Sequence, residues 1–484
     1  MISREILDKY DMTIGIECHV QLATTSKLFS GADNDANSKA PNEATSPIDF
    51  GLPGMLPVLN HQAIVLAAKA GKALRAEIAH VSRFDRKHYF YPDLPKGYQI
   101  TQMYQPVIIG GLVEAPMLDG SMITVQIHHA HLEEDAGKLT HYSDFSLVDL
   151  NRAGTPLIEI VSEPDIHSAA GAKAYATELH RLMTFAGVTY GDLYHGNMRF
   201  DVNLSVALKG AKELGTRAEV KNLNSFKSVE KAAEYEFVRQ IERLEKGEKI
   251  VQETRGWDDA TAKTSSQRSK EDAQDYRYMP DADIPPVVLS DQDIADMQAD
   301  MPLLPAYYRT SWQSLGLDRS VIEALLGNQS YAVLITEIQT NAGDDAARRV
   351  AHWFASSVGS GDEEVATIAS NFVPEGYVEL ATMVEKNELS STAAKEIFVE
   401  LLTSNASPRQ IAEQKNLLQV SDESAIMAIV DEVLADPSSA RSIEDIKAGQ
   451  EKAIGFLVGQ VMKKSAGKAN PGLAQQLIRQ RLEQ

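Results

Sequence analysis

The stretch IGIECHVQL, residues 14–22, places a carboxylate and an imidazole on either side of the only cysteine in 484 residues. Alternating polar and apolar residues are typical of a β-strand with one buried face, so Glu17 and His19 share the polar face. Cys18 then points into the core, where a free thiol behaves as a small hydrophobe. Glu17 and His19 could together ligate a divalent ion, and a solvated strand face is the alternative interpretation. The chemistry of this stretch is therefore assigned to these two polar residues and not to Cys18.

Two further acidic segments follow strand-like runs. HHAHLEEDAGK, residues 128–138, gathers three histidines and three acids within eight residues. Adjacent residues face opposite ways on a regular strand, so only one of Glu133 and Glu134 reaches a common site unless a bulge turns both inward. In MRFDVNLSV, residues 198–206, Asp201 stands among apolar residues, where a carboxylate needs a cation or several donors. A charged strand end and a structural carboxylate at a sheet end are the respective alternatives.

A fourth segment, RFDRKHYFYPDLPKGYQ at residues 83–99, interleaves basic and aromatic residues. A lysine here could meet a phosphate as a point charge, and the rings could stack on a base. A packed aromatic loop is the alternative. Taken together, the four segments offer mainly oxygen ligands, which suit Mg²⁺–phosphate chemistry better than zinc. The sequence contains no GxxxxGK[ST], GxGxxG, GxSxG or HExxH motif, so another architecture must hold any nucleotide.

The composition is that of a soluble globular protein, with 43% hydrophobic and 24% charged residues. The first residues lack the apolar core of a signal peptide, and no run of roughly 18 apolar residues occurs. We therefore expect a cytoplasmic protein without a membrane partner. The net charge of −21 argues against a nucleic-acid partner. Residues 446–484 nevertheless carry seven basic and two acidic residues, which suggests a local contact with a polyanion or, alternatively, a solvated helix face.

Strand-like alternation dominates the chain from residue 12 to about residue 294, with helical patterns between the strands. This pattern predicts an α+β domain with a largely antiparallel sheet, which the paired prolines of DADIPPVV bring to an end. The remainder shows the apolar periodicity of helices, and SNASPR at residues 404–409 is interpreted as a hinge between two helical units. The expected domains are residues 1–294, 295–408 and 409–484.

Long strings of this sequence resemble the family of B subunits of bacterial aspartyl/glutamyl-tRNA amidotransferases. The resemblance runs from near residue 13 to near residue 471, so it covers essentially the whole chain. It implies a glutamine-synthetase-like cradle domain, then an all-α helical domain, then a YqeY-like helical tail. The matching strings are IGIECHVQL, GLPGMLPVLN, FDRKHYFYPDLPKGYQI, HLEEDAGK, LVDLNRAGTPLIEIVSEPDI, EVKNLNSF, DYRYMPDADIPP and KAIGFLVGQVMKKSAGKANP.

The resemblance also implies an activity. In this family ATP phosphorylates the side-chain carboxylate of Glu-tRNA(Gln) or Asp-tRNA(Asn), and ammonia from the A subunit, a glutaminase, then displaces phosphate. The small C subunit joins the other two into a heterotrimer. Two rival interpretations remain at this point: a metal-dependent phosphohydrolase, in which the same carboxylates activate water, and a tRNA-binding scaffold without catalysis.

The family's site positions carry over to individual residues of this chain. We expect ATP at the cradle, held with Mg²⁺, and the mischarged tRNA at both the cradle and the tail. The metal ligands implied are Glu17, His19, Asp201 and one glutamate of the Glu133–Glu134 pair, of which Glu134 is favoured. The catalytic residues implied are Lys87, Glu133 and Asp201, with Lys87 and Arg86 binding the cofactor. The tail residues expected to contact tRNA are Lys463, Lys464, Lys468, Arg479 and Arg481.

The chain departs from the family at one loop. Many members resemble LFCGC…NTQVCPVCLGLPG there, with four cysteines that hold a structural zinc. This chain has LFSGAD…NEATSPIDFGLPG, with Ser30, Ala32, Ser46 and Asp49 at those positions. Because four soft tetrahedral ligands are missing, we expect no structural zinc and a loop held by packing.

Overall fold

The computed structural model consists of two compact units, Met1–Pro305 and Ala306–Gln484. No helix within the described residues is long and apolar enough to cross a membrane. The residues that the structure describes are 3–269, 275–358, 372–419, 423–448, 450–465 and 468–482.

The first unit is built around a ten-stranded sheet whose central strand is β1 (Tyr10–Gln21). On one side of β1 lie β12 (Met198–Leu208) and then β13 (Ala218–Leu223), and on the other side lie β11 (Pro156–Ser162) and then β8 (Met122–Glu134). These pairs are antiparallel, which confirms the predicted α+β class with a mainly antiparallel sheet. The other strands of this sheet are β2 (Glu77–Ile78), β6 (Ile108–Ile109), β7 (Leu112–Pro116), β14 (Glu253–Asp258) and β15 (Lys263–Ser269).

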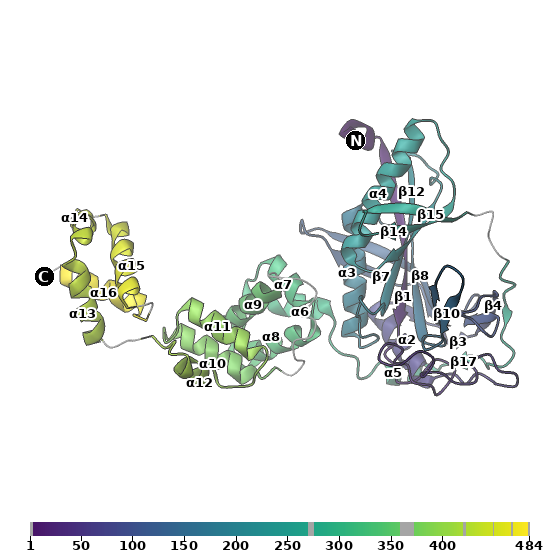
Figure 1. Ribbon diagram of the computed structural model, residues 1–484, viewed down its shortest axis with the longest axis horizontal. Helices are drawn as coiled ribbons and strands as arrows, with labels where there is room; N and C mark the ends of the chain where they lie inside the picture. The colour runs from purple at the N-terminus through teal and green to yellow at the C-terminus, as the bar shows by residue number, and fades with distance from the viewer. Residues whose placement is uncertain are drawn as a thin grey trace. The chain divides into compact units, whose positions relative to one another are not determined.

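One face of this sheet forms the hydrophobic core. Along β1 every second residue from Met12 to Val20 is buried, as the alternation predicts. Helices α2 (His61–Ala73), α3 (Ala169–Phe185) and α4 (Phe226–Glu245) contribute buried residues to the same core, and Figure 1 shows α3 and α4 along one side of the sheet. Cys18 is fully buried on this face, which confirms its structural role, and burial raises the pKa of its thiol.

Smaller sheets are built from other segments, among them the aromatic-basic stretch at residues 83–99. Strand β4 (Asp85–His88) pairs with β5 (Tyr98–Thr101) and with β16 (Met279–Pro280), which is almost 200 residues further along the chain. Strands β9 (Lys138–His141) and β10 (Ser146–Asp149) form a hairpin directly after β8. In Figure 1, β4 and β10 lie on the opposite side of the large sheet from α3 and α4. The remaining short pair is β3 (Val81–Ser82) with β17 (Val287–Val288).

The loop where the resemblance places four cysteines is closed by a buried ion pair. The Lys27 side chain is 0% exposed, and its Nζ lies 3.2 Å from Asp49 Oδ2 and 3.4 Å from the carbonyl oxygen of Leu150. The same Asp49 oxygen accepts hydrogen bonds from the backbone N–H of Ser46 at 2.7 Å and the hydroxyl of Ser30 at 3.5 Å. Polar contacts around Asp49 therefore hold this loop in addition to the packing that the sequence predicts.

The first unit extends past the expected boundary at residue 294. Helix α5 (Asp291–Met297) spans that position and contacts α2, and Lys69 of α2 forms an ion pair of 2.9 Å with Asp300. In the second unit, α12 (Pro408–Gln414) spans the expected boundary at 408/409 and packs against α10 (Pro374–Glu385) and α11 (Ser391–Leu401). The division into three functional domains stays a prediction.

The second unit is built from helices. Near its C-terminus, α13 (Glu423–Leu434), α15 (Ile454–Lys464) and α16 (Pro471–Leu482) share a small apolar core. The Asn470 side chain accepts a hydrogen bond from the backbone N–H of Leu473 at 3.1 Å, so it caps α16 as the sequence predicts. The other helices of this unit are α6 (Pro305–Ser311), α7 (Arg319–Leu325), α8 (Gln329–Ala342), α9 (Asp344–Val358) and α14 (Ala440–Lys447).

Candidate active site

The polar face of β1 positions two groups of side chains whose types could bind a metal ion. Glu17 pairs directly with Asp201 on β12, and His19 pairs directly with Glu159 on β11. Directly opposite residues on neighbouring strands point to the same face, so each of these pairs stands over the polar side of the sheet. Three donors come together on each side of β1. The first cluster is His19, Glu133 and Glu159, and the second cluster is Glu17, Asp201 and Glu219; within each, the ligand atoms lie within 4.8 Å of one another.

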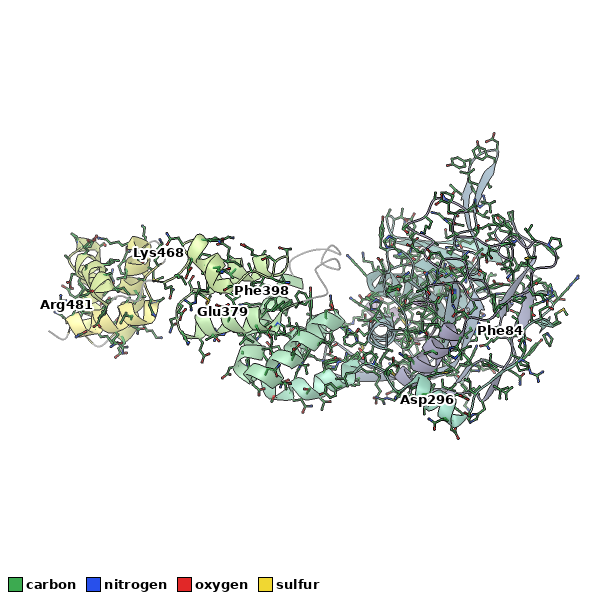
Figure 2. The ribbon with its side chains drawn as sticks, turned by 90° about the horizontal axis from the view of Figure 1, so that it is seen from below. Phe84, Asp296, Glu379, Phe398, Lys468 and Arg481 are labelled. Atoms are coloured by element: carbon green, nitrogen blue, oxygen red, sulfur yellow. The ribbon has the colours of Figure 1, made fainter. Side chains whose placement is uncertain are left out.

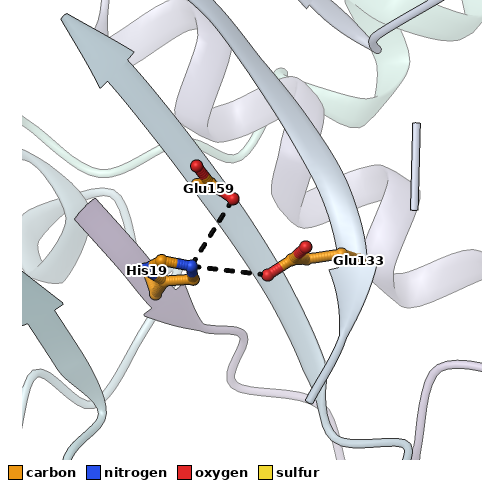
Figure 3. A group of neighbouring side chains, drawn as sticks. All are labelled: His19, Glu133 and Glu159. Carbon is orange, nitrogen blue, oxygen red and sulfur yellow. Dashed lines mark ion pairs between the residues drawn. The ribbon is translucent and has the colours of Figure 1, made fainter. Parts of the chain in front are cut away.

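The first cluster joins three neighbouring strands (Figure 3). The Nε2 atom of His19 lies 3.6 Å from Glu133 Oε1 and 3.5 Å from Glu159 Oε2. A second imidazole backs this group, since His131 Nε2 lies 3.4 Å from Glu159 Oε2 and 3.8 Å from Glu133 Oε2. One imidazole nitrogen and two carboxylates thus face a common point from β1, β8 and β11.

The charges around the first cluster favour the ionised form of Glu133, which is only 4% exposed. Burial alone would raise the pKa of Glu133, but the hydrogen bond with His131 and the nearby His19 and Lys87 hold it below its usual value. Burial likewise opposes protonation of His131, yet the adjacent Glu133 and Glu159 raise its pKa above the usual value. Glu133 is therefore held in its ionised form, and a cation at this point would meet two carboxylate groups and an imidazole nitrogen.

The second cluster contains three carboxylates and an ammonium group. Lys221 Nζ lies 2.8 Å from Asp201 Oδ2 and 3.1 Å from Glu219 Oε1. Glu17 accepts a hydrogen bond of 2.9 Å from the side-chain amide of Asn203. Burial raises the pKa of Glu17, and the neighbouring carboxylates raise it further. The two clusters therefore differ, since an ammonium group lies among the carboxylates of the second cluster only. Their residues on β1, Glu17 and His19, are nevertheless only two positions apart.

Lys87 and Arg86 point in different directions, as adjacent residues of a strand do. Lys87 faces the first cluster: burial lowers its pKa, but Glu133 and the surrounding groups raise it overall. Its Nζ lies 5.0 Å from the centre of the Tyr276 ring, and it forms no ion pair within the described part of the chain. Arg86 instead donates to Asp281 and Asp283, both at 2.7 Å. Its guanidinium is thereby engaged in holding β4 to the 279–283 segment.

Glu134 lies outside both clusters. Its carboxylate forms an ion pair with Lys96 and accepts a hydrogen bond of 2.9 Å from the backbone N–H of Ile100. Glu133, one residue earlier on β8, points to the opposite face and joins the first cluster. The geometry thus favours Glu133 as a metal ligand, whereas the sequence expectation assigns the metal to Glu134.

Four residues at the site were not predicted as site residues: His131, Glu159, Glu219 and Lys221. Glu159 stands in PLIEIVS as a single carboxylate in an apolar strand pattern, which is the same signal that identified Asp201. Glu219 and Lys221 share one face of AEVKNL, so their spacing carried a similar signal. The order of the strands in the sheet, which brings these faces together, could not be inferred from the sequence.

The basic residues of the tail are largely paired with acids. Lys464 lies 3.0 Å from Glu432, Arg479 lies 3.1 Å from Glu451, and Arg481 makes two contacts of 2.8 Å with Asp431. Lys463 and Lys468 form no ion pair among the residues that the structure describes. Figure 2 shows Lys468 and Arg481 at separate places on the helical tail. Contact with tRNA at these five positions stays a prediction.

Comparison with known proteins identifies relatives along almost the whole chain. Residues 12–295 match the family model described as the GatB/GatE catalytic domain, and residues 335–482 match the one described as the GatB domain. Over 489 residues the chain is 43% identical to the aspartyl/glutamyl-tRNA(Asn/Gln) amidotransferase B subunit of Trichodesmium erythraeum, covering 98% of both proteins. The B subunit of Polynucleobacter asymbioticus is 44% identical over 491 residues, covering 98% of this chain and 100% of that protein. That of Alkalilimnicola ehrlichii is 44% identical over 482 residues, with the same two coverages.

Proposed function

This chain belongs to the GatB family of amidotransferase B subunits, and we propose that it activates the side-chain carboxylate of a mischarged tRNA for amidation. The proposed substrates are Glu-tRNA(Gln), Asp-tRNA(Asn) or both, together with ATP. The observation that carries the proposal is the first cluster, which faces Lys87 over the polar side of the large sheet. This arrangement supplies ligands for a cation and a positive charge for a phosphate at one place.

The reaction needs activation because ammonia and a carboxylic acid merely exchange a proton at neutral pH. In the first step, a carboxylate oxygen of the substrate attacks the γ-phosphorus of ATP, and the bond from that phosphorus to the ADP oxygen breaks. In the second step, ammonia attacks the carbonyl carbon of the acyl phosphate. Inorganic phosphate leaves, a proton is lost from nitrogen, and the amide remains. The attacking carboxylate is already ionised, so the protein must chiefly neutralise phosphate charge and align the reactants.

The residues present fit a hard divalent cation. The first cluster offers one imidazole nitrogen and two carboxylates, and the second offers three carboxylates. Oxygen-rich sets of this kind suit Mg²⁺ or Mn²⁺, and the single imidazole is compatible with Mn²⁺ in particular. Bound there, such an ion would neutralise charge on the phosphates of ATP. His19, Glu133 and Glu159 would hold an ion at the first cluster.

Lys87 is the group of this chain best placed for the transferred phosphate. Its ammonium stays protonated next to Glu133, and the Tyr276 ring limits the directions that it can take. Since the ammonium has no carboxylate partner within ion-pair distance among the described residues, it is available for an anion. Lys87 is therefore proposed to contact the phosphate in both steps.

The partners proposed follow from the family. The relatives are B subunits, so this chain is proposed to act in a heterotrimer with a glutaminase (the A subunit) that supplies ammonia and with the smaller C subunit. The tail is proposed to contact tRNA. Lys463 and Lys468 are the better candidates for that contact because the other three basic residues must first leave their acidic partners.

The test is amidation by the reconstituted heterotrimer with ammonium chloride as nitrogen donor, so that the glutaminase is bypassed. We expect Lys87→Met to lower the rate by at least about 100-fold, because a fixed charge on the transferred phosphate is lost. Glutamine hydrolysis by the glutaminase should persist. Lys209→Ala is the matched control, since Lys209 is an exposed lysine on the same unit and should change nothing.

Labelled ATP distinguishes the rivals in the same assay. Transfer of the γ-phosphoryl group to mischarged tRNA supports the proposal, whereas hydrolysis of a phosphate ester without amidation supports a phosphohydrolase. Near-normal amidation by Lys87→Met would overturn the role assigned to Lys87. Full amidation by a heterotrimer in which both clusters have been neutralised would identify this chain as a scaffold.

A further inference from the structure

Arg199 lies on the polar face of the large sheet, next to the first cluster. It is the residue of β12 that stands directly opposite His19 of β1. Directly opposite residues of an antiparallel pair point to the same face, with Cβ atoms about 5 Å apart. The residues on either side of it, Met198 and Phe200, are buried in the core, as strand alternation requires. The guanidinium group of Arg199 is therefore on the face that carries the candidate metal ligands.

One carboxylate, that of Asp135, anchors this guanidinium. Nη2 of Arg199 donates a hydrogen bond of 3.0 Å to Asp135 Oδ2. The other carboxylate oxygen accepts a hydrogen bond of 2.9 Å from the backbone N–H of Ala136. The backbone N–H of Asp135 donates in turn to the carbonyl oxygen of Thr155 at 2.9 Å. Because the acceptor is fixed from several sides, it also fixes the direction in which the guanidinium lies.

Most donors of Arg199 remain available to a ligand. A guanidinium has five N–H groups, and the contacts of Arg199 with other charged or polar groups in the described part of the chain are with Asp135 alone. Asp135 also lies 3.4 Å from Nε of Arg152, which donates to the carbonyl oxygens of Ala136 and Gly137. Two guanidinium groups thus share one carboxylate, so the three side chains together carry a net positive charge. The Arg199 side chain is 31% exposed, so a ligand can reach it.

The charge of Arg199 is permanent. Asp135, followed by Asp201 and Glu133, raises the pKa of Arg199 although burial opposes its charge. A cation that cannot give up its proton leaves a bound carboxylate ionised. A protonated imidazole, by contrast, can transfer its proton to a carboxylate and thereby remove its nucleophilicity. Arg199 is therefore suited to an anion that has to remain an anion.

The proposed reaction brings two anions together. The side-chain carboxylate of the substrate has to approach the γ-phosphate of ATP, and their negative charges repel each other. Lys87 and a metal ion at the first cluster would offset the charge of the phosphate, and the carboxylate needs a positive group of its own. The planar fork of a guanidinium matches the two oxygens of a carboxylate and fixes their direction.

We propose that Arg199 binds the side-chain carboxylate of the mischarged amino acid and holds it for attack on the γ-phosphorus. This role rests on the proposed function. One carboxylate oxygen forms the bond to phosphorus while the bond from phosphorus to the ADP oxygen breaks, and Arg199 keeps all its protons. Arg199 also distinguishes substrate from product, because the neutral amide of Gln-tRNA(Gln) offers one acceptor oxygen in place of two charged ones.

The test compares the affinities of the reconstituted heterotrimer for Glu-tRNA(Gln) and Gln-tRNA(Gln), with Mg²⁺ and a non-hydrolysable ATP analogue present. The two aminoacyl groups differ only at the end of the side chain. Wild-type protein should bind Glu-tRNA(Gln) at least about tenfold more tightly, since only that ligand offers a charged partner to the guanidinium. Asp-tRNA(Asn) and Asn-tRNA(Asn) provide the same comparison for the shorter side chain.

Three variants identify the residue responsible for this preference. In Arg199→Gln the ratio of the two affinities should fall to about one, because the positive charge is lost. Arg199→Lys keeps the charge without the fork and should give an intermediate ratio. The matched control is Arg217→Gln, which removes an exposed arginine directly before β13 and should leave the ratio unchanged. With ammonium chloride, amidation by Arg199→Gln should be at least about 100-fold slower than by wild-type protein.

Equal affinities for the two tRNAs in wild-type protein would overturn the proposal, and so would an unchanged ratio in Arg199→Gln. Weaker binding of the ATP analogue alone by Arg199→Gln, together with an unchanged ratio, would assign Arg199 to the nucleotide. Circular dichroism checks folding, and Arg199→Lys carries the comparison if Arg199→Gln does not fold. Because the analogue prevents phosphoryl transfer, the ratio tests Arg199 even if labelled ATP shows that the tRNA is not phosphorylated.

Discussion

The two clusters on β1 begin from neighbouring residues of one polar strand face and yet have different surroundings. His19 meets carboxylates from β11 and β8, backed by the imidazole of His131. Glu17 meets Asp201 from β12 and a carboxylate from β13, where an ammonium already stands. The difference shows that β1 contributes one polar side chain to each cluster. The neighbouring strands determine whether a positively charged side chain already pairs with the carboxylates.

Removing one carboxylate from each cluster should therefore have unequal effects. Glu133→Gln should lower amidation by about 1,000-fold, since it removes a ligand from the cluster whose carboxylates form no ion pair with a lysine or arginine among the described residues. Glu219→Gln should lower amidation only about tenfold, because Lys221 keeps Asp201 as a partner. Amidation rates with ammonium chloride measure both, and Mn²⁺ binding should show the loss of the first site only in Glu133→Gln. Equal losses of activity would contradict the comparison.

The buried ion pair of Lys27 and Asp49 provides a comparison for Lys221, because the ammonium group of Lys27 has a purely structural role. Lys27 is fully buried, and burial lowers its pKa although Asp49 favours the charged form. Asp49→Asn leaves this ammonium without its counter-charge, so the first unit should lose about 3–5 kcal/mol of stability in urea unfolding. Mn²⁺ affinity at both clusters should stay unchanged in the folded variant. The double variant Lys27→Met, Asp49→Asn should recover part of the loss, and no recovery would contradict the assignment.

Acid should distinguish the imidazole-backed cluster from the lysine-backed one. Burial lowers the pKa of His129, which stacks on His131, to about 4, so the folded chain binds fewer protons there than the unfolded chain. This group therefore costs stability as the pH falls from about 6.5 towards 4, and the penalty is absent above that range. The free energy of unfolding in urea should be measured at about pH 7.5 and at about pH 5. Its decrease from the higher to the lower pH should be about 1 kcal/mol smaller for His129→Asn than for wild-type protein, after allowance for partial exposure. Lys221→Met should not change this pH dependence, and an equal change in both variants would remove the distinction.

Local patterns predicted the elements and the orientation of single side chains. The alternation in residues 14–22 placed Cys18 in the core and put Glu17 and His19 on the other face, and the structure confirms this placement. The isolated carboxylate in MRFDVNLSV correctly identified a residue that needs a cation, namely Asp201 with Lys221. Such inferences succeed because the periodicity of a strand is set by its own backbone.

The sequence was less informative about which of two adjacent residues reaches the candidate site. The sequence favoured Glu134 over Glu133 as a metal ligand, but Lys96, 38 residues earlier, engages Glu134 in an ion pair. Arg86 was expected at the cofactor; acids near residue 281 engage its guanidinium, and its contact with a cofactor stays a prediction. In both cases the partner lies far away in sequence, so no local pattern reveals it.

The sequence by itself determined a mainly antiparallel α+β unit, a helical second unit, the buried cysteine and most of the ligand-bearing strands. Only the tertiary structure decided that β11 and β13 complete the two clusters through Glu159 and Glu219, and that Lys221 stands inside the second. The physical reason is that side-chain alternation follows from the geometry of one strand. Strand order, by contrast, follows from pairing between segments up to about 200 residues apart, which is set by the common core that they bury.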